Sequence, residues 1–471
     1  MTASNNPEVV IIGAGLTGLT MAFYLKKAGI KFLVIDKSAK PGGVIQTVSE
    51  RGFVYETGPN TGVVSHPEMT ELFEDLAGKC TMETADPNAK RRLIWKDNQW
   101  NALPSGLWSA ITTPLFTWYD KFRILGEPFR VKGTNPNESL AELVKRRMGE
   151  SFLDYAIDPF ISGIYAGDPN KLVTRYALPK LWKLEQDYGS FIGGAMKKAK
   201  LPKSERDKKA TREVFSAKGG LSRLIEAMAD AIGSENMILS VDNTLIKPTS
   251  NGFQLQITTP EQLISIQTPH IVTTCGGYAL AGLLPFLNEE EIAPFNELKY
   301  AAVTQVLLGF EKWKGMSLKA FGGLVPGKEN KNILGVLFTS SFFEGRAPKG
   351  GALLSVFMGG TKRPEIAAMD NGEIESLLNK DLPRMLSNRT LSPDMTRILR
   401  YPKAIPQYTE STGRRYEMIE KLQQKYPGLI LAGNIRDGIG MADRVKQGRA
   451  IAEELISSVG KYNTKLLEVQ V

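Results

Sequence analysis

A glycine-rich turn close to the N-terminus constrains this chain more than any other feature. Four apolar residues, 9–12, lead directly into the turn, an apolar segment from Leu19 to Leu25 follows it, and a second apolar run, 32–35, ends in Asp36. This order predicts a strand, a helix and a second strand, which is the βαβ unit that binds dinucleotides. The turn consists of Gly13, Ala14, Gly15, Leu16, Thr17 and Gly18.

Each glycine of the turn has a separate physical role. Gly13 permits the sharp change from strand to helix, Gly15 lets a pyrophosphate approach the backbone because it has no Cβ, and Gly18 lets the helix pack closely on the strand. The free N–H groups of the helix N-terminus then face the phosphates, and Asp36 is placed to accept hydrogen bonds from a ribose. The alternative is a glycine-rich turn of an α/β protein that binds no nucleotide.

Length and composition favour a multidomain enzyme of a reducing compartment. A chain of 471 residues suggests two or three domains. No segment has the length and apolarity of a transmembrane helix, and residues 1–7 lack the features of a signal peptide. The two cysteines, Cys80 and Cys275, are far apart, so we expect a cytoplasmic location without disulfides or a zinc site.

Histidines and charged residues exclude several kinds of chemistry. With two histidines in the chain, His66 and His270, we expect no metal site and no Ser-His-Asp triad, and we predict that His66 lies in a surface loop. Part of the net charge of +9 lies in the segment 197–209, which is interpreted as a solvated loop. The alternative is a surface for an acidic substrate or an anionic lipid. No zinc-finger, RNP or basic-helix pattern is present, so we expect no nucleic-acid partner.

The two ends of the chain carry similar units. Residues 429–434 predict a buried strand that ends at Gly433, followed by a glycine-rich loop through Gly440 and a helix from Ala442 to about Leu455. The N-terminus of this helix, near Met441, can point at a second part of the cofactor and stabilise negative charge on a reduced flavin. NAD enzymes do not need such a closing unit, so the pattern favours FAD. The alternative is a surface loop at 433–440.

The segments between these two units predict the remaining architecture. Residues 67–79 predict a helix, residues 90–103 predict a hairpin that turns at Asp97-Asn98, and Ser139 with Glu142 predicts a capping box that opens a helix. Helical periodicity dominates from 105 to 200, and strand patterns recur at 237–258, 300–310 and 334–358. An apolar row at 106–125 is predicted to pack in the core, with insertion into a membrane interface as the alternative.

The predicted fold class is α/β, with a Rossmann-like FAD-binding domain assembled from distant segments, an inserted mixed-sheet substrate domain and a helical subdomain. The expected boundaries are 1–65, 206–290 and 406–471 for the FAD-binding domain, 66–104 and 291–405 for the substrate domain, and 105–205 for the helical subdomain, which faces the substrate or a membrane.

Longer motifs carry a more specific signal. The opening glycine turn and Gly42-Gly43 resemble the flavin amine-oxidase superfamily as a whole. The segment 161–169, Ile-Ser-Gly-Ile-Tyr-Ala-Gly-Asp-Pro, resembles the oxygen-dependent protoporphyrinogen oxidases within it almost residue for residue. The segments 215–221, 321–326, 405–408 and 432–434 are also similar to that family.

The resemblance implies a reaction and a set of site residues. It implies that FAD takes hydride from a porphyrinogen in successive steps, and that O2 reoxidises the flavin and gives hydrogen peroxide. Asn60 and Arg92 match residues at the reaction site, and Arg92 matches the arginine that pairs with a substrate propionate. Gly163, Leu324, Leu337 and Phe357 match residues of the substrate pocket wall. The expected FAD contacts are Gly13, Ala14, Gly15, Leu16, Thr17, Gly18, Asp36, Lys37, Lys40, Gly42, Gly43, Gly58, Pro59, Leu245, Gly433, Gly440, Met441 and Ala442.

Several alternatives stay open at this stage. Asp36 stands where the superfamily usually has glutamate, and Lys40 stands where it often has arginine. The site residues have plainer interpretations, since Arg92 can be a solvated charge, Asn60 a turn residue and the apolar residues ordinary core. Other partners consistent with the family are a membrane surface to which the protein attaches peripherally, a second copy of the chain and a haem-pathway chelatase that receives the product.

Three other functions compete with protoporphyrinogen oxidation. One is oxidation of coproporphyrinogen III, which has more carboxylates and so needs more cations than Arg92 alone. Another is a flavin oxidase for amines or carotenoids, which would not need the 161–169 segment. The third is an FAD-binding protein without turnover.

Overall fold

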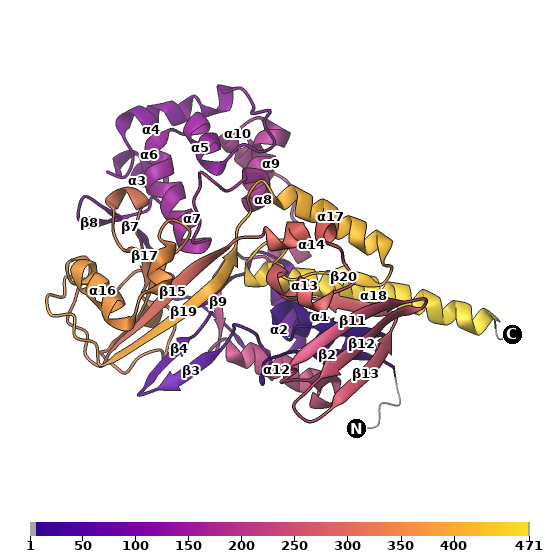
Figure 1. Cartoon of the computed structure of the whole chain (residues 1–471). Coiled ribbons are helices and arrows are strands. Elements are labelled where there is room, and N and C mark those ends of the chain that lie inside the picture. The colour runs from indigo at the N-terminus through magenta and orange to yellow at the C-terminus, as the bar shows by residue number, and fades with distance from the viewer. Residues whose placement is uncertain (1–5, 470–471) are drawn as a thin grey trace.

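The computed structural model describes residues 6–469, and Figure 1 shows a group of helices above two bodies that contain sheets. Residues 1–5, which belong to the segment where the sequence predicts no signal peptide, and residues 470–471 lie outside the described part. Among the helices of the described residues, none has the length and apolarity needed to cross a membrane.

A five-stranded parallel sheet forms the centre of one body. Its order is β10-β2-β1-β14-β20, so β1 pairs on one side with β2, the next strand along the chain, and on the other side with β14, which begins at His270. The strands are β1 (Val9–Ile12), β2 (Phe32–Ile35), β10 (Met237–Ile238), β14 (His270–Thr273) and β20 (Leu429–Leu431). All four residues of β1 are buried, as expected for a parallel strand covered on both faces.

Different elements cover the two faces of this sheet. Val9 and Ile11 of β1 pack against three helices, α1 (Leu16–Lys27), α12 (Ser222–Ile232) and α18 (Met441–Val469). Val10 and Ile12 pack on the opposite side against a three-stranded antiparallel sheet and against helices α13, α14 and α17. These elements are β11 (Asn243–Thr249), β12 (Gly252–Thr258), β13 (Leu263–Thr268), α13 (Leu280–Leu283), α14 (Glu289–Asn296) and α17 (Thr412–Lys425).

The second body contains a seven-stranded mixed sheet of order β19-β15-β18-β17-β16-β7-β8. Its strands are β7 (Arg92–Lys96), β8 (Gln99–Ala102), β15 (Tyr300–Phe310), β16 (Gly322–Leu324), β17 (Ile333–Leu337), β18 (Ala352–Gly359) and β19 (Met395–Pro406). One face packs on α16 (Asn371–Met385) through fully buried side chains such as Val306, Val336 and Val356. The predicted hairpin turn at 97–98 is confirmed, with positive φ at both residues.

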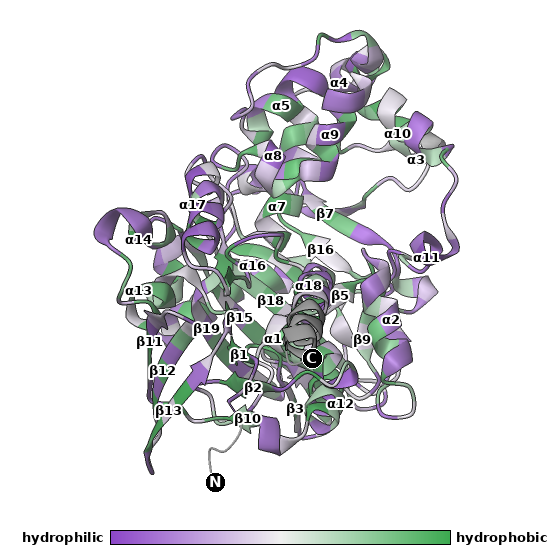
Figure 2. Cartoon of the chain, turned by 90° about the vertical axis from the view of Figure 1, so that its right-hand side faces the viewer, coloured by the Kyte–Doolittle hydropathy of each residue, from purple (hydrophilic) through white to green (hydrophobic). Residues whose placement is uncertain are grey.

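The helical group at the top of Figure 1 consists of residues 107–199. Its helices are α3 (Leu107–Thr112), α4 (Trp118–Leu125), α5 (Leu140–Arg147), α6 (Glu150–Phe152), α7 (Asp158–Ile164), α8 (Thr174–Ala177), α9 (Pro179–Tyr188) and α10 (Phe191–Ala199). The short α11 (Glu205–Lys208) lies apart from them, beside α2 (Pro67–Asp75) (Figure 2), where Arg206 pairs with Glu68 and Glu71. The capping box predicted at the start of α5 is present, because Ser139 and Glu142 bond reciprocally.

The prediction that the row at 106–125 packs in the core is wrong for most of its large side chains. Trp108 is 77% exposed, Tyr119 73% and Phe122 67%, while Leu115 and Phe116 are buried. The helices α3 and α4 lie at the outer edge of the group (Figure 1), where no element within residues 6–469 covers these exposed side chains. Amphipathicity therefore identified the helices but not the side that faces solvent.

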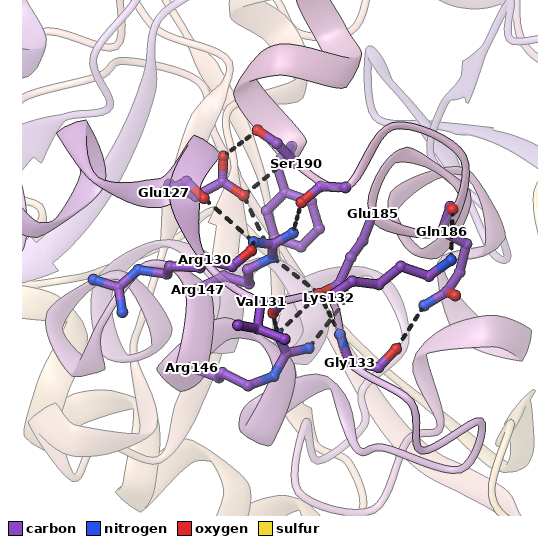
Figure 3. A network of polar contacts seen from close by, with 12 residues as sticks. Glu127, Arg130, Val131, Lys132, Gly133, Arg146, Arg147, Glu185, Gln186 and Ser190 are labelled. Atoms are coloured by element: carbon purple, nitrogen blue, oxygen red, sulfur yellow. Dashed lines mark hydrogen bonds and ion pairs between the residues drawn. The ribbon is translucent and has the colours of Figure 1, made fainter.

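A buried ionic network holds this outer part of the helical group (Figure 3). Arg147 is fully buried, and its Nε lies 3.4 Å from a carboxylate oxygen of Glu127 and 3.0 Å from one of Glu185. Glu127 also accepts hydrogen bonds from Ser190 Oγ and from the N–H groups of Phe191 and Ile192. The loop that follows Glu127 is thereby fixed to the N-terminus of α10.

Figure 2 shows the apolar strands β15 and β18 inside a more polar periphery.

Smaller elements complete the fold. These elements are β3 (Thr47–Glu50), β4 (Phe53–Glu56), β5 (Gly62–Val63), β6 (Met82–Thr84), β9 (Val214–Ala217), α2 (Pro67–Asp75) and α15 (Thr339–Phe342). Helix α2 is shorter than the helix predicted at 67–79, and α18 continues to Val469, beyond the predicted end near Leu455. The domain boundaries expected from the sequence stay a prediction.

Candidate active site

The glycine turn 13–18 has the geometry of a phosphate-binding turn. A Cβ on Gly18 would lie 2.0 Å from the Gly13 carbonyl oxygen, so α1 can pack this closely on β1 only with glycine there. A Cβ on Gly15 would meet nothing within 4 Å, so the space above Gly15 is open. Within the described part of the chain, no side chain caps the N-terminus of α1. Its first N–H groups are therefore free to bind an anion.

Asp36 follows β2 and supports the same turn. Its carboxylate accepts hydrogen bonds from the N–H of Ala14 and the N–H of Ser38, both at 2.7 Å. Lys37 and Lys40 are exposed nearby. The Val241 N–H donates to the Asp36 carbonyl oxygen, and Leu245 lies four residues farther along the chain, in β11. The structure thus places the predicted FAD contacts Asp36, Lys37 and Lys40 just after the end of β2.

Two loops stack on the glycine turn. Gly42 donates its N–H to the Ala14 carbonyl at 2.7 Å, and a Cβ on Gly43 would lie 3.4 Å from Gly15 Cα. Gly58 packs against this first loop so tightly that a Cβ would lie 1.9 Å from the Val44 carbonyl oxygen. Pro59 and the buried Asn60 follow, and Asn60 Nδ2 donates to the Gly58 carbonyl at 3.1 Å.

The C-terminal unit, residues 433–442, lies on the other side of the glycine turn. Gly433 has a φ of +85° and lies against the Thr274 backbone at the end of β14. Its N–H donates to Gln447 Oε1 at 2.8 Å, and the buried Arg444 donates to its carbonyl oxygen. Helix α18 begins with the buried Met441 and Ala442, just after Gly440, and its Gly448 packs directly on the Thr17 carbonyl of α1.

These observations fit a bound dinucleotide. The open space over Gly15 and the uncapped α1 suit a pyrophosphate. Asn434 Oδ1 is buried at the end of β20 and has no hydrogen-bond partner among the described residues, which leaves one acceptor free for a ligand N–H or O–H. The distant segments 13–18, 42–60 and 433–442 therefore form one continuous cradle.

The predicted substrate residues lie on the face of the mixed sheet that α16 does not cover. Leu324 and Phe357 are both in register with Gly335, and Arg92 and Leu337 are both in register with Gly322. Gly322 and Leu324 are two residues apart, so both rows point to the same side of the sheet.

The burial of these side chains differs from that of the opposite face. Leu324, Leu337 and Phe357 are only half-buried, although they lie in central strands of the sheet. On the α16 side, the neighbouring Val336 and Val356 are almost completely inaccessible to solvent. Part of the apolar surface of Leu324, Leu337 and Phe357 is therefore left uncovered by protein.

Gly163 and Arg92 mark two edges of this face. A Cβ on Gly163, in α7, would lie 2.4 Å from Leu324 Cδ2, so α7 lies directly over Leu324. Arg92 is exposed at the start of β7, and its guanidinium carbon lies 5.9 Å from the ring centroid of Phe321. No ion pair involves Arg92 in the portion of the chain that the structure describes. Its charge is available to a ligand.

The structure also reveals polar residues that the sequence analysis missed. Gln305 and Ser355 are fully buried on the same sheet face, and Gln305 Nε2 donates to Ser355 Oγ at 2.9 Å. Glu56 and Arg346 form a buried ion pair at 3.1 Å. Burial raises the pKa of Glu56, while its contacts with Thr47, Leu221 and Arg346 oppose that rise. Gln305 was detectable as the one amide inside the apolar run 303–310.

His66 differs from its prediction as a surface-loop residue. Its side chain is 17% exposed, and Nε2 lies 2.9 Å from Asp443 Oδ1, in the first turn of α18. This pair joins the start of α2 to the helix that closes the cradle. A contact across 377 positions of sequence could not be read from local pattern.

Comparisons with known proteins agree with this geometry. The family model described as flavin containing amine oxidoreductase matches residues 16–456. The chain belongs to this family. Because its glycine turn and βαβ unit are those of a dinucleotide-binding domain, the flavin is FAD, and the protein is an FAD-dependent oxidoreductase. The FAD-binding α/β fold and the family resemblance predicted from the sequence are confirmed.

Individual relatives place the chain within the family. The chloroplastic protoporphyrinogen oxidase of Nicotiana tabacum is 31% identical over 97% of this chain and 87% of its own length. The coproporphyrinogen III oxidase of Bacillus subtilis (strain 168) is 25% identical over 96% of this chain and 98% of its own length. The crystal structure of a provisionally named protoporphyrinogen oxidase from Exiguobacterium sp. 255-15 has a TM-score of 0.79 at 22% identity, covers 96% of this chain and 99% of its own, and so shares the fold.

Proposed function

We propose that the protein oxidises a porphyrinogen to the corresponding porphyrin, with O2 as the electron acceptor and hydrogen peroxide as the second product. The half-open apolar face with Leu324, Leu337 and Phe357, and with Arg92 at its edge, is the observation that carries this proposal. A flat, apolar macrocycle with carboxylates at one edge matches that distribution. Relatives named as oxidases of two porphyrinogens support it.

Protoporphyrinogen IX is the proposed substrate because of the distribution of charge. Arg92, Lys96 and Arg397 point to this face of the sheet. Lys96 donates to the carbonyls of Pro114 and Leu115, and Arg397 pairs with Glu50, so Arg92 is the one of these three cations that remains for a ligand. Coproporphyrinogen III carries propionates on all four rings and would leave two edges without a cation.

The chain's own residues would bind and orient the reactants. When bound, FAD accepts a hydride from the substrate and passes two electrons to O2. The glycine turn and the α1 N-terminus would hold the pyrophosphate, and Asp36 would hold the ribose. The apolar face would exclude water from the macrocycle, and Arg92 would fix its orientation by a charge-assisted contact with a propionate.

A direct assay tests this proposal. The purified protein, loaded with FAD, is mixed with protoporphyrinogen IX or coproporphyrinogen III, and porphyrin fluorescence and peroxide are followed together. We expect both products, with a higher kcat/KM for protoporphyrinogen IX. A clear preference for the tetracarboxylate would overturn the substrate assignment, and an absence of porphyrin with both substrates would overturn the reaction.

We also propose that the outer part of the helical group attaches the protein peripherally to an anionic membrane surface. Phe129 is 89% exposed, Val131 87% and Leu125 71%, in addition to the exposed residues of α3 and α4. The acidic residues between 105 and 135 are Asp120 and Glu127, and both are buried. The exposed charges of this stretch are therefore all positive, and together with the aromatic side chains they suit the headgroup region of a bilayer.

Vesicle binding tests the membrane proposal. We expect the protein to sediment with vesicles that contain an anionic lipid, and we expect a Phe129→Ser, Val131→Ser double variant to remain in the supernatant. Leu263→Ser is a matched control, because Leu263 is 68% exposed on β13, outside the helical group. Equal binding by the double variant and the control would contradict the proposal. Formation of a homodimer and transfer of the product to a chelatase stay predictions.

A further inference from the structure

The strand β15 contains a buried carboxamide that its packing does not explain. The side chain of Gln305 is completely inaccessible to solvent, between apolar neighbours on β15 such as Val303 and Leu307. Burial of an amide is unfavourable unless its donors and acceptor are satisfied. The contacts of Gln305 therefore indicate what it holds in place.

Those contacts lead to one short segment of the cofactor cradle. Gln305 Nε2 donates to the Glu56 carbonyl at 3.2 Å and to Ser355 Oγ at 2.9 Å. The Tyr401 hydroxyl lies beside the Thr57 carbonyl and 3.3 Å from Gln305 Oε1, and its single proton serves one of these acceptors at a time. Two successive carbonyls, at 56 and 57, are thus bound by side chains of the substrate sheet.

The same segment is fixed from its other side. The Glu56 carboxylate accepts hydrogen bonds from Thr47 Oγ1 at 2.7 Å and from Leu221 N at 3.0 Å, in addition to its ion pair with Arg346. Gly58 then packs on the Val44 carbonyl, within the loop that lies against Gly15. Residues 56–58 are therefore the point where the substrate sheet and the phosphate-binding turn are joined.

We propose that Gln305 and Tyr401 are positioning residues, which set the segment Thr57–Asn60 against FAD and the substrate. Neither side chain needs to contact a reacting atom for this role. They fix the distance between the apolar substrate face, from which both project, and the loop that carries Asn60. The effect on turnover rests on the proposed porphyrinogen oxidation, whereas the effect on bound FAD does not.

Tyr401→Phe is the sharpest variant, because it removes one hydroxyl and leaves the ring in place. We expect kcat for the porphyrinogen to fall by about tenfold with little change in KM, because misplacement of a positioned group affects the reaction more than substrate affinity. We also expect the visible circular dichroism of bound FAD to change in both Tyr401→Phe and Gln305→Leu. Tyr24→Phe is the matched control, because the Tyr24 hydroxyl is also part-buried and bonded, to Asp75 at 3.1 Å, but it lies near the end of α1, away from the cradle.

The outcomes separate this inference from the proposed function. A wild-type protein that binds FAD but produces no porphyrin refutes the proposed function, and the circular dichroism of bound FAD still decides the positioning role. If Tyr401→Phe has the kcat and flavin spectrum of Tyr24→Phe and wild type, the inference is wrong. Should Gln305→Leu fail to fold, Tyr401→Phe alone decides.

Discussion

Replacement of Arg92 by alanine is the most direct perturbation of the proposed substrate site. The side chain is exposed, makes no ion pair within the described residues, and projects from the edge of the apolar face in register with Gly322 and Leu337. Its loss therefore removes little from the folded protein, and the free energy of unfolding should change by less than about 0.5 kcal/mol. The effect should appear in substrate binding.

The expected magnitude follows from one hydrogen bond to a charged group. Such a contact contributes about 1.5–3 kcal/mol, so the dissociation constant of the porphyrinogen should rise by about 10- to 150-fold. Arg92→Lys should be intermediate, because an ammonium keeps the charge but cannot bind a carboxylate through two parallel bonds. FAD content should be unchanged in both variants, since Arg92 lies outside the cradle.

The assay is steady-state porphyrin fluorescence at varied porphyrinogen concentration, with the flavin absorbance as a check of FAD content. Arg91→Ala is the matched control, because it removes the same charge from an exposed neighbouring position. Local alternation along an extended chain points neighbouring side chains to opposite sides. An unchanged KM in Arg92→Ala, or an equal rise in Arg91→Ala, would refute the assignment of Arg92 to the propionate.

Three further predictions test other parts of the structure. Gly163→Val should raise KM, because its Cβ would lie 2.4 Å from Leu324 Cδ2 and must displace that side chain, and a KM equal to wild type would contradict the position of α7. Arg147→Met should lower the free energy of unfolding by about 3–5 kcal/mol in a denaturant titration, because the buried Glu127 loses its cation and Glu185 keeps only Arg146, and a loss below about 1 kcal/mol would show that the network is not needed. Burial of the Asp443 carboxyl group acts to raise its pKa, but hydrogen bonds with His66 and with Gly440 N hold this pKa below its ordinary value of 3.8. The resulting stabilisation is complete above the pKa that Asp443 has in the unfolded chain, and it is lost as the pH falls through the pKa of Asp443 in the folded protein. Below about pH 4, the free energy of unfolding should therefore fall more steeply in wild type than in His66→Ala, as acid titrations of both proteins would show.

Local sequence was enough to predict the dinucleotide-binding turn. Gly18 is needed because a Cβ there would meet the Gly13 carbonyl of the same βαβ unit, Gly13 has a φ of +112°, and Gly15 leaves the space above it open. These three requirements follow from the spacing of the motif alone. The strand at 300–310, the hairpin at 97–98 and the capping box at Ser139 were predictable for the same reason. In each case the interacting residues are near neighbours in sequence.

Orientation relative to the rest of the protein was not predictable in this way. The aromatic residues of α3 and α4 had the pattern of a packed helix, yet they face outward, because no other element of the described part of the chain covers that side. His66 had no local partner and was assigned to a loop, yet it binds Asp443. A helical pattern indicates that one face of the helix is more apolar than the other, but only the packing of other segments decides which face is buried.

The substrate half of the site also depended on assembly. By itself the chain determined a dinucleotide turn, the type and order of most elements, and the absence of local motifs for metal or nucleophilic chemistry. Only the tertiary structure put Arg92, Leu324, Leu337 and Phe357 on one face and bound Gln305 to the backbone at Glu56. The reason is that sheet register pairs strands that are far apart in sequence, and neither hydrophobic periodicity nor turn chemistry specifies which distant strand becomes the neighbour.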